Sequence, residues 1–131
     1  MKRLIFFALM MVCSVSWAKW ELSSSDEDQM IFYDKSTIRK NGVMSRMWVM
    51  LNYSKVQTDS SGNSWMSTKS LHAHNCRDET VAIISAVQYS GSMGKENVVS
   101  NSTWQERELE WMPIIPGSTG RTLWKIACGK K

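Results

Sequence analysis

The residues best suited to chemistry are His72 and His74, the only histidines of the chain. They occupy alternate positions of a predicted β-strand, so both rings project from one face, as metal ligands on a strand can. A zinc site needs three or four ligands, and no nearby Asp or Glu pairs obviously with the two histidines. We therefore predict no metal site and interpret the pair as surface or half-buried side chains.

Acidic residues cluster at 26–28 and at Glu106, Glu108 and Glu110. Glu106 and Glu110 would be neighbours on a helix, but a solvated acidic face is commoner than an acid/base pair. No Ser-His-Asp order is recognisable, and the Gly-Ser-Thr-Gly stretch at 117–120 lacks the lysine of a phosphate-binding loop. The sequence predicts no catalytic residue, no cofactor and no enzyme.

The first eighteen residues predict a secretory signal peptide. Two basic residues precede an apolar run at 4–12, and small residues stand at Ser16 and Ala18. This pattern is typical of a leader cleaved between Ala18 and Lys19. The apolar run is about half of the ~20 residues that span a bilayer, which argues against a membrane anchor.

Lipid attachment at Cys13 is the alternative, but it needs a small residue before the cysteine, and Val12 is branched and bulky. We expect a soluble exported protein, periplasmic or extracellular, without stable membrane insertion. Residues 19–131 have the length of a single domain. Without the leader the net charge falls from +4 to +2, because Lys2 and Arg3 are lost. The remaining basic residues are scattered, so we predict no nucleic-acid partner.

Two cysteines, Cys76 and Cys128, remain after cleavage. Exported proteins meet an oxidising compartment, so we predict one disulfide between them. The chain-entropy estimate gives such a bridge about 4 kcal/mol. A metal pair or a catalytic thiol is the alternative, and the absence of a C-x-x-C spacing supports neither.

Period-two patterns predict strands at 30–33, 37–40, 43–53, 65–75 and 80–89, with an edge strand at 96–100. Asn41-Gly42 predicts a two-residue hairpin turn. Residues 100–103 predict a break, and 104–111 mix helical propensity with spaced tryptophans.

One helix is predicted, over 119–128. Ser118 or Thr119 can cap its start, and Gly129 can end it. Leu123, Ile126 and Ala127 form its apolar stripe. A helix of this length is unstable alone, so packing must hold it. The predicted fold class is mainly antiparallel β (α+β): a single sheet-based domain with a C-terminal helix packed on the sheet and tethered by Cys76–Cys128.

Tryptophan is the other unusual feature, with six residues after leader removal. Such side chains fill small cores and also anchor contact surfaces. We expect at most one or two of the six to be exposed anchors.

The order of these features resembles the surface-adhesin protein E family of Gram-negative bacteria. The matching residues are Trp20, Tyr33-Asp34-x-x-x-Ile38, Trp48-Val49, Ser67-x-Lys69, Cys76, Tyr89-Ser90-x-x-Met93-Gly94, Pro116-Gly117-Ser118 and Ala127-Cys128. The resemblance implies an antiparallel sheet with a disulfide-tethered C-terminal helix. It also implies adhesion to host matrix proteins from a lipid anchor, and the chain departs from that pattern at Cys13.

Two functional hypotheses follow. The first is an exported, non-catalytic binding module that contacts a protein partner in the envelope or host matrix, with its oligomeric state left open. The second is a periplasmic small-ligand carrier or enzyme that uses the cleft between helix and sheet, with His72 and His74 as its suggestive groups. A deep pocket lined by both histidines and a carboxylate would favour the second hypothesis.

Overall fold

The structure, a computed structural model, describes residues 19–131. Its strands are β1 (Glu21–Ser25), β2 (Gln29–Tyr33), β3 (Arg39–Asn41), β4 (Met44–Thr58), β5 (Ser64–Asn75), β6 (Thr80–Tyr89), β7 (Val98–Thr103) and β8 (Met112–Pro113), followed by helix α1 (Thr119–Cys128). The predicted leader, with Cys13 and Ala18, lies outside the described residues. The predicted fold class is confirmed.

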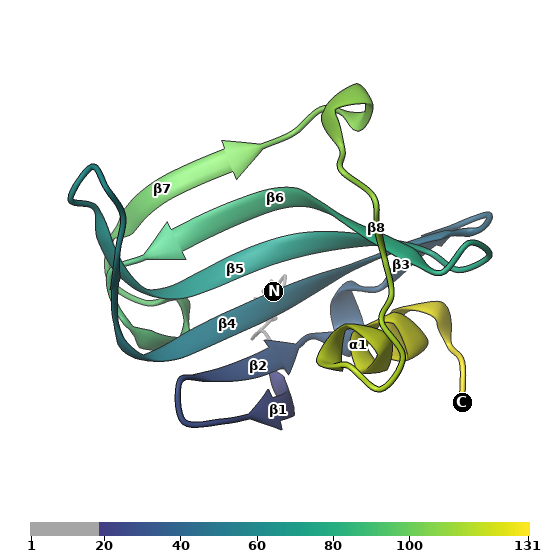
Figure 1. The fold of residues 1–131 in the computed structure, drawn as a ribbon, viewed down its shortest axis with the longest axis horizontal. Coiled ribbons are helices and arrows are strands. Elements are labelled where there is room, and N and C mark those ends of the chain that lie inside the picture. Colours follow the sequence, from purple (N-terminus) through teal and green to yellow (C-terminus); the bar gives the residue numbers. More distant parts are fainter. Residues whose placement is uncertain (1–18) are drawn as a thin grey trace, which may run out of the picture.

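The strands form one antiparallel sheet in the order β1-β2-β4-β5-β6-β7 (Figure 1). The short β3 pairs with the start of β4, and β8 pairs with the start of β6. Short turns join most neighbouring strands, as antiparallel pairing allows. The long β4 and β5 form the centre of the sheet.

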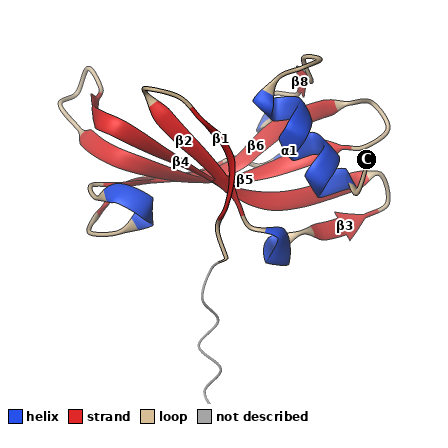
Figure 2. Ribbon diagram, turned by 90° about the horizontal axis from the view of Figure 1, so that it is seen from below, coloured by secondary structure: helices blue, strands red, loops and turns tan. Residues whose placement is uncertain are grey.

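Helix α1 covers one face of the sheet near the β3 and β8 end (Figure 2). Met47 and Val49 of β4 pack there with Leu123 and Ala127 of the helix and with Tyr33. This cluster is the main core. Because the helix is short, burial of its apolar stripe provides the stability that an isolated helix lacks.

The opposite face of β4 is also partly covered. A 3₁₀ turn at Ser92–Gly94 packs on it. The Asn52 side chain accepts a hydrogen bond from the Met93 amide at 2.8 Å, and the Ser67 hydroxyl accepts one from the Gly94 amide at 2.8 Å. Met50 beneath this turn is fully buried.

The predicted helix bounds and caps are confirmed. The Ser118 hydroxyl accepts a hydrogen bond from the Arg121 amide at 3.1 Å, and Gly129 ends the helix with φ +67°. Trp124, which the predicted stripe omitted, is 4% exposed. It lies beside Leu123 on the inward side, where its ring reaches the end of β5.

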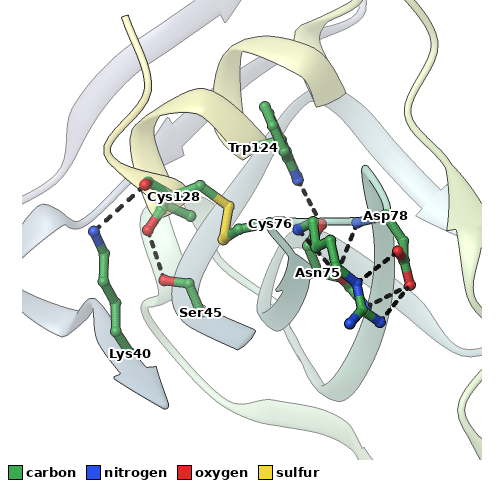
Figure 3. The surroundings of a disulfide bond; sticks show 9 residues. Lys40, Ser45, Asn75, Cys76, Asp78, Trp124 and Cys128 are labelled. Carbon is green, nitrogen blue, oxygen red and sulfur yellow. Dashed lines mark hydrogen bonds and ion pairs between the residues drawn. A yellow bond between two sulfur atoms is a disulfide. The ribbon is translucent and has the colours of Figure 1, made fainter. Parts of the chain in front are cut away.

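The Cys76–Cys128 disulfide fastens the end of α1 to the end of β5 (Figure 3). The two α-carbons are 5.6 Å apart, within the usual range of roughly 4.4–6.8 Å. Around it, the Ser45 hydroxyl donates to the Ala127 carbonyl at 2.6 Å and the Trp124 indole donates to the Asn75 carbonyl at 3.0 Å. Lys40 donates to the Cys128 carbonyl at 3.4 Å. The final helix carbonyls therefore find partners.

Two local predictions were wrong, and a strand was missed. The hairpin turn is Gly42-Val43, since Asn41 pairs with Met44 and only the glycine has positive φ. Residues 100–103 are part of β7, because β6 supplies backbone partners that their polar side chains do not reveal. The polar β1 was not predicted.

Within residues 19–131 no helix is long and apolar enough to cross a membrane.

Candidate functional site

The two histidines lie beneath α1; His72 is half-buried, as predicted, whereas His74 is in the interior. On β5, His72 pairs with Met47 and His74 pairs with Ser45, so both face the helix-covered side of the sheet. Their ring centroids are 5.9 Å apart, and His74 is 1% exposed. Burial lowers the pKa of both imidazoles from 6.5 to about 4, and the neighbouring His74 contributes to the shift at His72. Both rings are therefore neutral at pH 7.

Within residues 19–131, four surface hollows are lined by other residues, and neither histidine is among them. Among residues 19–131, no three His, Cys, Asp or Glu side chains group closely enough to hold a metal ion. The acidic residues also lie apart from both rings. Asp26 caps the β1–β2 turn by accepting from the Asp28 amide at 2.8 Å. Glu106 and Glu110 do not become helical neighbours, because the local 3₁₀ turn spans only Glu106–Glu108.

The segment whose structure the sequence left ambiguous forms an arch along the edge of β6. We call residues 104–112 the strap. It begins where the Trp104 amide donates to the Ile84 carbonyl at 2.9 Å, and it ends where Met112 pairs with Val81. In Figure 1 it descends from the end of β7 to β8. The Gln105 amide donates to the Glu108 carboxylate at 2.8 Å, which fixes the turn within it.

The strap exposes two tryptophans. Trp104 and Trp111 are each 39% exposed, whereas Trp124 is in the core. Both border a hollow of about 560 Å³ between the strap and the β3–β4 hairpin. Its lining is Arg39, Lys40, Asn41, Met44, Arg46, Ala73, Ile84, Trp104, Glu106, Leu109 and Trp111. We call this hollow the tryptophan groove.

Charges of opposite sign border the tryptophan groove. Arg39, Lys40 and Arg46 come from the hairpin, and Glu106 comes from the strap. The small Ala73 forms part of the floor and is itself 2% exposed. The groove thus combines aromatic walls with a polar, charged rim, the composition that protein interfaces favour.

Two smaller hollows are also lined by tryptophans. One of about 250 Å³ lies at the same strap and is lined by Ile83, Trp104, Glu108, Glu110 and Met112. The other, of about 320 Å³, is lined by Trp20, Asp34, Thr37, Trp48, Lys69, Val87 and Tyr89. Trp104 is shared by the two strap hollows, which makes it the central aromatic residue of this edge.

Sequence reasoning expected one or two exposed tryptophans without saying which. The spacing of Trp104 and Trp111 does not indicate that both are exposed, because the path of the strap is set by its hydrogen bonds to β6 at both ends. Between them, at 106–110, four of the five residues are charged and Leu109 is the exception, which was the available indication of a chain that faces water.

Comparison with known proteins is consistent with this architecture. A search of the curated proteins found no match. Crystal form II of Haemophilus influenzae protein E has a similar fold, with a TM-score of 0.58 and 10% identity over 87% of this chain and 97% of that one. Protein E from non-typeable Haemophilus influenzae gives 0.54 and 11%, over 81% of this chain and 78% of that one.

The sequence itself matches the family model described as surface-adhesin protein E over residues 17–129. The match extends from the predicted cleavage region to the residue that ends α1. It includes the disulfide, the strap and both of its exposed tryptophans. The chain belongs to the surface-adhesin protein E family.

Proposed function

We propose that this chain is an exported, non-catalytic binding module that contacts a protein partner, in the envelope or the host matrix, through the tryptophan groove. The family and its fold support an adhesin-like role. We also propose that residues 1–18 are a leader cleaved between Ala18 and Lys19, and that residues 19–131 are the exported domain.

The observation that carries the proposal is the pair of half-exposed tryptophans at the rim of one groove. Trp104 and Trp111 stand on opposite ends of the same strap, each 39% exposed. Exposed tryptophans supply large contact area with few rotatable bonds, and they are enriched among the residues that dominate binding energy. Truncation of such an anchor typically weakens binding by about 2 kcal/mol or more.

The charges around the tryptophan groove indicate which charges a partner surface should carry. A partner with an apolar side chain for the groove, flanked by an acidic residue, would meet Arg39 and Arg46. Rim charges of this kind govern orientation and association rate more than affinity. Salt should therefore slow association without abolishing the complex.

The test uses residues 19–131 immobilised and exposed to envelope and host-matrix extracts, followed by titration with the purified partner. The double variant Trp104→Ala/Trp111→Ala should lose the captured protein and weaken the titrated affinity at least thirtyfold. Val56→Ser is the matched control, because Val56 is 60% exposed on β4 far from the groove. Equal binding by the double variant and the wild type would contradict the proposed interface.

A further inference from the structure

Asp34 is a buried carboxylate near the start of the described chain. It is 2% exposed and directly follows β2. One oxygen, Oδ1, accepts hydrogen bonds from the amide and the hydroxyl of Ser36, at 2.9 and 2.5 Å. The other oxygen, Oδ2, accepts from the backbone nitrogen of Lys19 at 3.2 Å.

No cationic side chain of residues 19–131 makes an ion pair with Asp34; the three ion pairs there involve other carboxylates. A buried carboxylate without a positive partner is costly, because hydrogen bonds offset only part of its lost hydration. The group that donates to Oδ2, the backbone nitrogen of Lys19, therefore decides whether this carboxylate has a positive partner. In the uncleaved chain, the Lys19 nitrogen belongs to the peptide bond with Ala18 and carries no charge.

We propose that leader removal converts this hydrogen bond into an ion pair between the new α-ammonium group of Lys19 and the buried carboxylate of Asp34. The inference rests on the proposed cleavage between Ala18 and Lys19. A leader peptidase hydrolyses that bond with one water molecule, so Ala18 departs as a carboxylate and the Lys19 nitrogen becomes an ammonium. The nitrogen already lies at hydrogen-bond distance, so little movement is needed.

The ion pair would fasten the first residues of the mature chain to the sheet. The Asp34 amide donates to the Trp48 carbonyl at 3.2 Å, and the Asp34 carbonyl accepts from the Thr37 hydroxyl at 2.6 Å. Asp34 is thus tied to β4 independently of its carboxylate. Trp20, the residue after the new terminus, lines the 320 Å³ hollow together with Asp34 and Trp48. The mature chain therefore becomes more stable than the uncleaved one. The ion pair at Lys19 also holds the neighbouring Trp20 in place at the wall of the 320 Å³ hollow.

The test is a double-mutant cycle on unfolding by urea, which needs no binding partner. Chains 19–131 and 18–131 are compared with Asp34 and with Asp34→Asn. Adding Ala18 should lower the folding equilibrium constant about tenfold, or about 1.4 kcal/mol, when Asp34 is present, and less than twofold in Asp34→Asn. Glu21→Gln is the matched control, since Glu21 pairs with Lys35 at 3.6 Å and should leave the effect of Ala18 unchanged.

An equal effect of Ala18 in both backgrounds, or no effect in either, would overturn the ion pair. If Asp34→Asn does not fold, acylation of the α-amine decides the question: it should be about tenfold slower in folded 19–131 than in the urea-unfolded chain, and equal rates would refute the pair. Mass spectrometry of the exported protein checks the cleavage separately, and a mature chain that begins at any residue other than Lys19 would overturn the inference for the natural protein.

Discussion

Acid should destabilise this domain through the two histidines beneath α1. Burial holds the pKa of His72 and His74 at about 4, against 6.5 for the unfolded chain. Between these values the unfolded state binds more protons, so stability is complete above pH 6.5 and falls as the pH drops toward 4. One pKa unit corresponds to 1.36 kcal/mol, so at pH 4.5 each histidine removes about 2.5 kcal/mol and the two together about 5 kcal/mol. That is a large share of the 5–15 kcal/mol typical of a domain.

Urea unfolding at half-unit steps from pH 7.5 to 4.5 measures this loss. The double variant His72→Gln/His74→Gln is the control, because the chain has no other histidine and its carboxylates are retained. The slope of stability against pH should be steep between pH 6.5 and 4.5 in the wild type and much flatter in the variant. Equal slopes, or histidine resonances that titrate near pH 6.5 in the folded protein, would refute the burial of these rings.

Three further results are expected. Reduction, or Cys128→Ser, should destabilise the domain by about 4 kcal/mol, and amide exchange should then accelerate first at 126–128 while 81–84 stay protected. Gly94→Ala should destabilise by about 2 kcal/mol by urea unfolding, because its Cβ would lie 2.9 Å from the terminal methyl of the fully buried Met50 at a φ of +68°, whereas Gly42→Ala, with open space, should cost about half as much. The exported protein should show Lys19 as its first residue and no acyl mass; a lipid-modified Cys13 would contradict a soluble mature form.

Local sequence features predicted much of the fold. Helix α1 was predicted to the residue because Ser118 and Gly129 act within one turn of its ends. The β6 strand followed from its apolar run at 81–84, and the disulfide followed from there being only two cysteines after the predicted leader. The helix and the strand depend on residues close in sequence, and two cysteines can form only one intramolecular disulfide.

The candidate site depended on contacts between distant residues and could not be predicted in the same way. The strap takes its path from hydrogen bonds to β6 at Ile84 and Val81, and the groove exists because the β3–β4 hairpin lies opposite it. Similarly, an H-x-H on a strand does not tell which face the helix covers, so the burial of His72 and His74 became visible only with the strand register.

The most direct test of the proposed interface is amide hydrogen exchange of residues 19–131, free and saturated with the purified partner. Exchange should slow on both sides of the tryptophan groove, in the strap at 104–112 and in the hairpin at 39–46. The β4–β5 turn at 59–63, on the far end of the sheet, serves as the internal reference. Protection confined to that turn or to β1, with the strap and the hairpin unchanged, would contradict the assignment of the tryptophan groove as the binding site.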